Sequence, residues 1–276
     1  MMSMTLIRRR MREAAGHSLA ESWRRIARAA ALPVIFLLTI LVLWELLVRV
    51  LGIPQYLLPS PVAILRSFLS DPSALIGHTA VTMFEAITGF CVANILGFAL
   101  AILFAHSPTA ARTVYPYAIA LKTTPIVAMA PLLVLWFGTG VTSKIIASAV
   151  ICFFPMLVNA TRGLNAIEGE ALDLFRSLDA GRLAILVKLR LPSSLPYLFS
   201  AFKISSSLSV VGAIVGEFVG AQRGLGYVIL VSSYHLETER MFAAIIAAAL
   251  GGVFFYFTVV AIEWLVVPWS DAQQIA

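Results

Sequence analysis

Charged residues are scarce in this sequence, and their scarcity excludes an ordinary soluble domain. Of the 276 residues, 12% are charged and 60% are hydrophobic, whereas soluble domains carry about 25% charged and about 45–50% apolar residues. Several apolar runs are long enough to cross a bilayer as helices. The composition therefore predicts an all-α, polytopic membrane protein.

Several kinds of chemical site are also missing. The two cysteines, Cys91 and Cys152, lie inside apolar runs, and the four histidines share no metal-ligand spacing, so we expect neither a disulfide framework nor a metal centre. No segment has the G-x-x-x-x-G-K-[ST] pattern that cradles phosphates. The basic residues lie in short segments beside apolar runs, which favours membrane orientation over nucleic-acid binding. We therefore predict a chain that is not an enzyme, holds no cofactor of its own and binds no nucleic acid.

Six apolar runs predict six transmembrane helices in a membrane domain of residues 30–268. The first run, residues 29–50, is too long for a secretory signal and has no small-residue cleavage site after it. The other five runs are residues 78–104, 114–137, 141–158, 197–219 and 242–267. Shorter amphipathic segments are expected at residues 62–68 and within 221–240, and a surface helix is possible at 14–28.

The distribution of lysine and arginine predicts the orientation. Residues 1–29 are rich in arginine, and so is the charged segment of residues 168–192 between the fourth and fifth runs. Fewer basic residues fall on the opposite side, namely Arg66, Lys144, Arg223 and Arg240. The positive-inside rule then places both termini, including the tail of residues 269–276, and the charged segment in the cytoplasm. We expect a multi-pass protein of the inner (plasma) membrane.

The segment of residues 168–192 is the only long charged island between apolar blocks. Leu172, Phe175 and Leu178 recur every three residues within it, which places them on one face of a helix. Ala180-Gly181 offers a break, and a second helical pattern follows until Pro192, where a proline should end it. The pattern predicts a helix, a turn and a helix with an exposed apolar face, which is either a docking surface or a solvated loop.

Ionisable residues within the apolar runs are candidates for a substrate path, because they are costly in a bilayer. Lys122 lies in a run that Pro125 and Pro131 loosen, so it either lines a path or extends to the interface. Glu85 is expected to reach the interface, and Glu217 either pairs with Arg223 or faces an outer vestibule. The candidate path residues are Glu85, Lys122, Thr123, Thr124, Met129, Ser209 and Glu217. We expect Glu45 to contact its neighbours or the interface.

The missing phosphate loop also limits the mechanism. A pump built from this chain would need another subunit to supply energy. The acidic residues in the apolar runs are too few and too scattered for a proton relay. No inverted repeat of broken helices, typical of secondary transporters, is evident.

The charged island resembles the coupling motif of permeases of binding-protein-dependent ABC transporters. That motif is Glu-Ala-Ala, three residues, Gly, nine residues, Ile, one residue and Leu-Pro. Anchored on Leu191-Pro192, its Ile position falls on Leu189, its Gly position on Asp179 and its opening triplet on residues 173–175. The spacing matches, although the residue types at the triplet and the glycine differ. The runs TPIVAMAPLLVLWFGTG and GEFVGAQRGLGYVI are similar to those of the nitrate, sulfonate and taurine import permeases.

The resemblance implies that the island forms a cytoplasmic helix that sits in a groove of an ATPase subunit. The implied coupling residues are Glu170, Leu172, Asp173, Phe175, Arg176, Leu178, Asp179, Ala180 and Gly181. Because aspartate replaces the glycine, the turn is expected to move to Ala180-Gly181.

The resemblance also implies an assembly and a substrate class. The implied partners are a second copy of the chain, two cytoplasmic ATPase subunits that hold ATP and Mg, and an extracytoplasmic substrate-binding protein. The substrate would be a small solute, either nitrate-, sulfonate- or taurine-like or pyrimidine- or riboflavin-like. The alternative is a channel or scaffold whose island docks a cytoplasmic partner that is not an ATPase.

Overall fold

The computed structural model describes residues 31–167 and 169–269. The basic N-terminal segment with its expected surface helix, Glu168, and the tail after Trp269 lie outside these residues. The chain divides into two compact units, one ending at Leu65 and the other beginning at Arg66. Each unit is described by itself.

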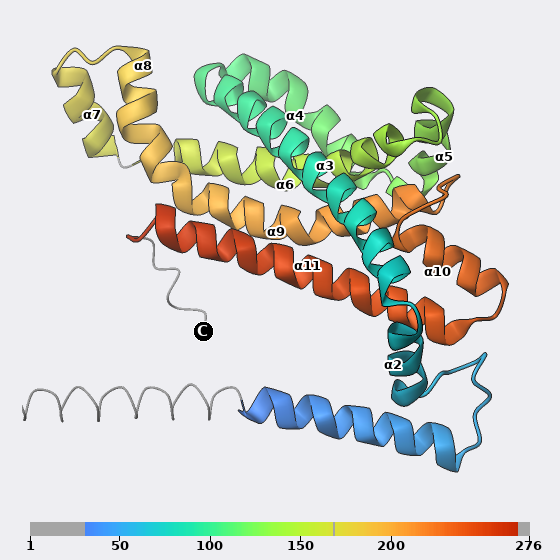
Figure 1. The fold of residues 1–276 in the computed structure, drawn as a ribbon. Helices are drawn as coiled ribbons and strands as arrows, with labels where there is room; N and C mark the ends of the chain where they lie inside the picture. Colours follow the sequence, from blue (N-terminus) through green and yellow to red (C-terminus); the bar gives the residue numbers. More distant parts are fainter. Residues whose placement is uncertain (1–30, 168, 270–276) are drawn as a thin grey trace, which may run out of the picture. The chain divides into compact units, whose positions relative to one another are not determined.

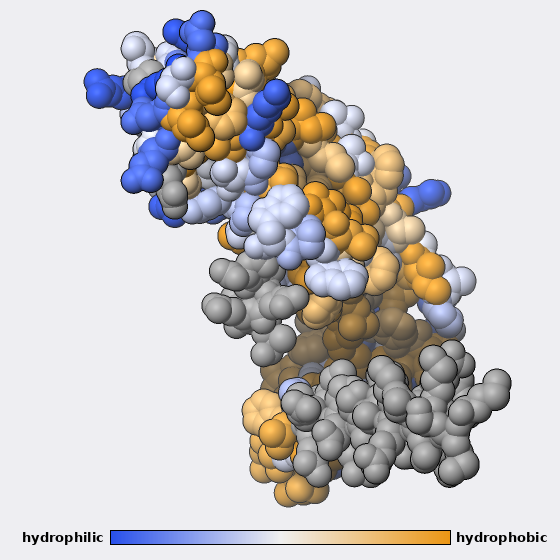
Figure 2. Space-filling view, turned by 90° about the vertical axis from the view of Figure 1, so that its left-hand side faces the viewer, coloured by the Kyte–Doolittle hydropathy of each residue, from blue (hydrophilic) through white to orange (hydrophobic). Residues whose placement is uncertain are grey.

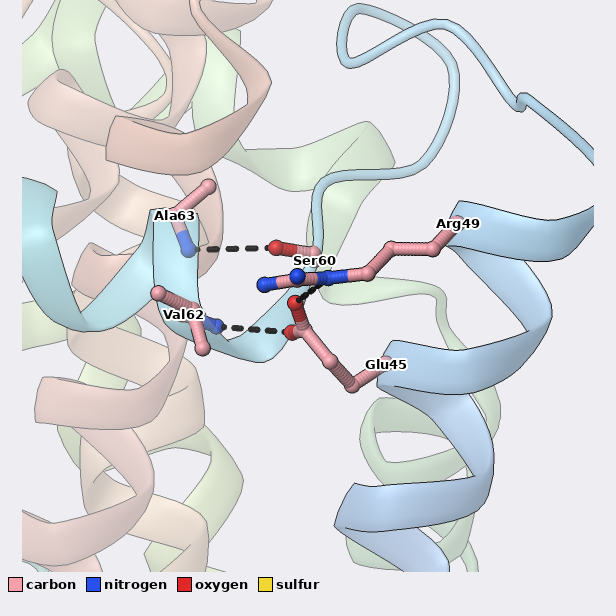
Figure 3. A network of polar contacts seen from close by, with 5 residues as sticks. All are labelled: Glu45, Arg49, Ser60, Val62 and Ala63. Carbon is pink, nitrogen blue, oxygen red and sulfur yellow. Dashed lines mark hydrogen bonds and ion pairs between the residues drawn. The ribbon is translucent and has the colours of Figure 1, made fainter.

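The first unit contains the first expected span and the start of a short helix. The helix Ala31–Val50 is long and apolar enough to cross a membrane, and α2 (Pro61–Ser70) begins in this unit. The Glu45 carboxylate accepts hydrogen bonds from the Arg49 Nε at 2.6 Å and from the Val62 amide at 3.1 Å, as Figure 3 shows. The carboxylate thus caps the start of α2, where a negative charge is favourable. The expectation that Glu45 contacts its neighbours is confirmed.

The second unit consists of helices joined by turns and loops and contains no strand within the residues that the structure describes (Figure 1). Its α-helices are α3 (Pro72–His106), α4 (Pro108–Thr123), α5 (Ile126–Phe137), α6 (Val141–Asn165), α7 (Gly169–Ser177), α8 (Arg182–Ile185), α9 (Leu191–Glu217), α10 (Leu225–Tyr234) and α11 (Thr238–Val266). Among the described residues, five helices are long and apolar enough to span a membrane, or up to six if the bent pair α4–α5 counts as one span. The all-α membrane fold is confirmed.

Small residues bring the three central helices together. A Cβ added at Gly89 of α3 would lie 2.6 Å from the Ser148 Cβ of α6, and one at Gly212 of α9 would lie 2.6 Å from the Ser148 Cα. The Ser148 hydroxyl donates to the Ser209 carbonyl oxygen at 3.0 Å. Between helices in lipid, such close approach and polar contacts replace the hydrophobic driving force. Ser209, one of the candidate path residues, is fully buried in this packing. It therefore lies between packed helices.

The expected third span is broken, which corrects the prediction of one helix over residues 114–137. α4 ends at Thr123 and α5 begins at Ile126, and the two are bent by 100°. Pro125 donates no backbone hydrogen bond and forces the preceding residue out of the helical region. Thr124 accordingly adopts φ −72° and ψ 124°.

The helix after the charged island does not end before Pro192, which corrects a second prediction. Helical structure continues from Arg182 to Glu217. A π-helical turn, Leu186–Arg190, precedes α9, and the Leu191 amide donates to the Leu186 carbonyl oxygen. A new α-helix begins at Leu191, so Pro192 falls in a first turn, where a missing N–H disrupts no hydrogen bond.

Other boundaries extend beyond the apolar runs. α3 begins at Pro72 because the Asp71 carboxylate accepts a hydrogen bond from the Ala74 amide at 3.0 Å and so caps the helix. Its end at His106 lies close to the predicted end at residue 104. α6 and α11 begin or end several residues outside the expected limits, because polar residues at the interface continue a helix that no proline or glycine ends. The short helices α2 and α10 match the two amphipathic segments.

Candidate functional site

The first candidate site is the segment formed by α7, the following turn and α8, at one end of the second unit (Figure 1). α7 carries Glu170, Leu172, Asp173, Phe175 and Arg176, and the turn carries Leu178, Asp179, Ala180 and Gly181. Asp173 and Arg176 form an exposed ion pair at 3.2 Å. All nine residues that the motif singled out therefore lie in one short segment.

The apolar face of this segment differs from the one that the sequence spacing indicated. Leu172 and Phe175 are half-buried, whereas Leu174, Leu178 and Leu183 are exposed by 59%, 71% and 72%. The exposed apolar surface thus comprises Leu174, Leu178 and Leu183, and we call it the leucine face. Of the three residues that the spacing indicated, Leu178 is exposed, whereas the packing of α7 partly covers Leu172 and Phe175.

The turn after α7 is centred on Asp179, not on Ala180-Gly181 as expected. Asp179 has φ +55°, while Gly181 has φ −64°. The Ala180 amide donates to the Phe175 carbonyl oxygen and the Asp179 amide to that of Arg176, both at 3.0 Å. These two hydrogen bonds form a Schellman motif, in which the left-handed residue is usually glycine. Asp179 therefore adopts the backbone conformation that the glycine of the motif would provide.

A second candidate site is a buried polar cluster around Glu217, at the end of α9. The Thr82 hydroxyl of α3 donates to the Glu217 Oε1 at 2.6 Å and accepts a hydrogen bond from the Leu225 amide at 2.8 Å. The Gly226 amide donates to the Glu217 Oε2. Leu225 and Gly226 open α10, so the carboxylate occupies the N-terminus of that helix, a favourable place for an anion. The cluster ties α3, α9 and α10 together.

Two glycines make room for this carboxylate. Gly224 has φ +106°, and a Cβ there would overlap the Glu217 carboxylate. A Cβ at Gly226 would lie 2.6 Å from the Ile214 carbonyl oxygen. The Gly224 amide donates to the His78 Nδ1 at 3.0 Å, so that nitrogen is the unprotonated one. The Gly-Leu-Gly sequence is therefore explained by close approach of backbone to a buried carboxylate.

The structure corrects three expectations about charged residues at this end. Glu217 contacts Thr82 and Gly226, whereas its expected partner Arg223 is exposed. Glu85, expected at the interface, is only 2% exposed and interacts with Glu217 and Lys144. Lys144, counted among the extramembrane basic residues, is 1% exposed, and its Nζ donates to the Thr139 carbonyl oxygen at 2.6 Å. Lys144 offsets part of the cost of burying the two carboxylates, which otherwise repel each other.

An ion pair between α9 and α11 was missed in the sequence. The Lys203 Nζ lies 2.9 Å from the Glu263 Oε2, and Glu263 is buried. Each residue is a charged side chain within an apolar run, and the two charges have opposite signs. This combination is the sequence signal that could have identified the pair. It joins helices whose residues are 60 positions apart.

The third candidate site is a cavity of about 340 Å³ at the break between α4 and α5. Lys122, Thr123 and Thr124 line it together with apolar residues of α6, and the Lys122 Nζ lies 4.6 Å from the centre of the Phe154 ring. Met129 is half-buried and does not line it. The cavity combines an ammonium group, hydroxyl groups and an aromatic face, which suits a small polar organic solute.

Outside these three sites, the described residues contain no metal-binding group and one buried cysteine. No group of three or more His, Cys, Asp or Glu side chains among them could hold a metal ion. Cys152 is buried, and its Sγ donates to the Ser205 carbonyl oxygen at 3.2 Å. Its environment is that of a small packing residue.

Comparisons with a family model and with curated proteins all match this chain to transport permeases. Residues 93–266 match the family model described as the binding-protein-dependent transport system inner membrane component. The chain is 33% identical to a formylaminopyrimidine transport permease of Halalkalibacterium halodurans, over 87% of this chain and 96% of that one. It is 34% identical to a riboflavin transport system permease of Chloroflexus aurantiacus (88% and 91% covered), and 25% identical to the taurine transport system permease of Escherichia coli (94% and 97%).

A solved structure shares the fold. An inward-facing structure of the MetNI methionine ABC transporter matches with a TM-score of 0.62 and 20% identity, over 68% of this chain and 94% of that one. Because most of the solved chain is covered, the helical arrangement of that transporter extends to the larger part of this one.

Proposed function

This chain belongs to the family of binding-protein-dependent transport system inner membrane components, and we propose that two copies of it form the membrane path of an ATP-driven importer. In this proposal two ATPase subunits hold ATP and Mg, and a substrate-binding protein delivers the solute from outside. The chain itself transmits motion and catalyses no covalent step. The family membership and the apolar helices support a multi-pass protein of the inner membrane.

The α7–α8 segment would face the cytoplasm and dock the ATPase subunit. Arg162, Arg176, Arg182, Lys188 and Arg190 gather at this end of the second unit, which supports a cytoplasmic location by the positive-inside rule. Both chain termini would then also be cytoplasmic.

The observation that carries the proposal is the leucine face beside the Asp179 turn. Three exposed leucines, Leu174, Leu178 and Leu183, lie beside the charged residues Asp173 and Arg176. An exposed apolar surface with a charged rim is typical of a docking helix that enters a groove. The turn at Asp179 holds α7 and α8 in a fixed relation, so that a push on α7 reaches α9.

The experiment is co-purification with the ATPase subunit encoded beside this chain. We expect Leu178→Asp to lower the amount of retained ATPase at least about tenfold, since a charge in an apolar groove easily costs more than 1.4 kcal/mol. The matched control is Tyr234→Asp, because Tyr234 is 78% exposed at the end of α10. Equal retention by both variants would refute the docking surface, and purification without any ATPase would favour the channel or scaffold.

The cavity at the α4–α5 break would form part of the translocation path. Broken helices in membrane proteins are tolerated where they line a cavity, and transporters use them at substrate sites. We expect Lys122→Met to slow uptake while ATPase retention stays normal. Unchanged uptake would remove Lys122 from the path and leave it with the interfacial role.

The substrate is proposed to be a small nitrogen heterocycle. Relatives named for formylaminopyrimidine and riboflavin are 33–34% identical to this chain, whereas those named for sulfonates and taurine are 25–28% identical. Calorimetry on the neighbouring binding protein tests this class directly. Tight binding of taurine or an alkanesulfonate and none of a pyrimidine or flavin would reverse the assignment.

A further inference from the structure

Behind the leucine face lies a cavity that the coupling role does not explain. It has a volume of about 260 Å³ and lies where the end of α3 meets α7 and the start of the helix Arg182–Glu217. Its polar lining consists of His106, Arg176, Arg182 and Arg190, and Leu172 and Ile185 supply an apolar wall. We call it the arginine pocket.

The charges of the arginine pocket are not balanced within the described residues. Arg176 pairs with Asp173 at 3.2 Å. Arg182 and Arg190 form no ion pair with any carboxylate in residues 31–167 or 169–269. Among the described residues, three guanidinium groups therefore share one carboxylate, and this excess of positive charge suits an anion.

One of the arginines is held in place by the fold. Arg190 is half-buried, and its Nη1 donates to the Ala105 carbonyl oxygen at the end of α3, at 3.1 Å. It is the last residue of the π-helical turn Leu186–Arg190, and π-turns are frequent at functional sites. The guanidinium keeps further N–H donors for a ligand, since it has five in all. Part of the anion site is thus pre-organised.

The position of the pocket indicates where its ligand comes from. The long apolar helix α3 ends at His106, and the long apolar helix Arg182–Glu217 begins at Arg182, so the ends of two membrane-spanning helices meet at the pocket. Leu103 and Val187, close to these ends, are exposed by 49% and 51%. Figure 2, which faces this end, shows hydrophilic side chains gathered beside hydrophobic ones. A positive pocket next to exposed apolar side chains fits a phosphate that carries acyl chains.

We propose that the arginine pocket binds the phosphate of an anionic phospholipid head group, with the acyl chains along the apolar ends of α3 and the helix Arg182–Glu217. Arginine suits this ligand because its planar fork matches two phosphate oxygens at once. The lipid would contact α7 and α8 from the side opposite the leucine face. Because the pocket is complete in one chain, the proposal does not depend on the proposed ATPase docking.

The test is lipid retention by the purified full-length chain, measured by native mass spectrometry. Detergent-solubilised protein is titrated with phosphatidylglycerol or phosphatidylcholine. We expect phosphatidylglycerol to be retained at least about fivefold better, and Arg182→Gln to weaken its retention about tenfold, the loss of about 1.4 kcal/mol for one charge-assisted contact. Arg182 is the variant of choice because, unlike Arg190, it supports no backbone carbonyl. Arg223→Gln, an exposed arginine at the α10 end, is the control and should retain the lipid normally.

Three outcomes would overturn the proposal. Equal retention of both lipids would show that the pocket does not select an anionic head group, and equal loss in Arg182→Gln and Arg223→Gln would show that the pocket is not the binding site. Displacement of phosphatidylglycerol by an equal concentration of glycerol phosphate would show that the ligand is a soluble phosphate and not a lipid. If Arg182→Gln kept the lipid and lost only the ATPase subunit, the pocket would serve an acidic side chain of that partner.

Discussion

The backbone conformation of Asp179 predicts how the turn after α7 responds to substitution. Asp179 adopts φ +55° between two hydrogen bonds of a Schellman motif, and its side chain is exposed. A substitution therefore changes the backbone preference of the turn and removes no buried contact. Glycine, asparagine and valine at this position form a graded series.

The expected magnitudes follow from the cost of a left-handed residue. That conformation costs about 1–2 kcal/mol for most L-residues and less for Asp or Asn. Glycine removes the cost but loses about 0.5–1 kcal/mol of backbone entropy on folding, so Asp179→Gly should stabilise the turn by under about 1 kcal/mol. Valine is β-branched and should destabilise it by about 1–2 kcal/mol or more. Asparagine should resemble the aspartate.

Hydrogen exchange followed by mass spectrometry measures the turn directly, because the Asp179 and Ala180 amides are its two donors. We expect exchange of the peptide around α7 to slow by up to about fivefold in Asp179→Gly, and to accelerate about tenfold in Asp179→Val. ATPase stimulation by substrate should fall in the valine variant only. If valine and asparagine exchanged at the same rate, the left-handed conformation would not govern this turn, and the reasoning would be wrong.

Three further predictions concern the second unit. Gly226→Ala places a Cβ 2.6 Å from a backbone carbonyl oxygen, and we expect a loss of about 1–3 kcal/mol, seen as a lower Tm of the solubilised protein. Reversing the charge of Lys203 or Glu263 alone should destabilise the protein, and exchanging both should restore it, with a coupling energy of about 0.5–3 kcal/mol in a double-mutant cycle. The hydrogen bond from the Ala74 amide, and a second from a serine hydroxyl, hold the pKa of Asp71 below its usual value. The stability that the lowered pKa adds is present above the unfolded pKa of about 4 and is lost as the pH falls through the folded pKa. Asp71→Asn, which keeps a good helix cap, should therefore flatten the fall in Tm below about pH 4.

The spans were predictable because local sequence decides them. Long apolar runs require helices in a bilayer, where every backbone group must be bonded within the segment. Asp71-Pro72 and Ser107-Pro108 mark helix starts by capping and by the fixed φ of proline. The 100° bend at Pro125 was not predictable. A proline indicates where a helix can break, but the packing of neighbouring helices decides whether the helix bends there or stays straight.

The partners of buried charges were not predictable, because they come from distant parts of the chain. Thr82 and Glu217 are 135 residues apart, yet they share a hydrogen bond of 2.6 Å. Sequence spacing placed Glu85 and Lys144 near helix ends, from which either one could have reached water. Only the packing of α3, α6 and α9 decides that both are buried.

The helix Arg182–Glu217 connects the end of the second unit that carries the arginine pocket to the end that carries the buried Glu217 cluster. Its 36 residues rise about 54 Å at 1.5 Å per residue. The Asp179 turn and the arginine pocket lie at its start, and Glu217 at its end is bonded to the first amides of α10. A continuous helix passes displacement along its axis, whereas the loop that the sequence indicated at Pro192 would absorb it. The π-turn ahead of Pro192 keeps this helix continuous, so a displacement at its start would be transmitted to the Glu217 cluster at its end.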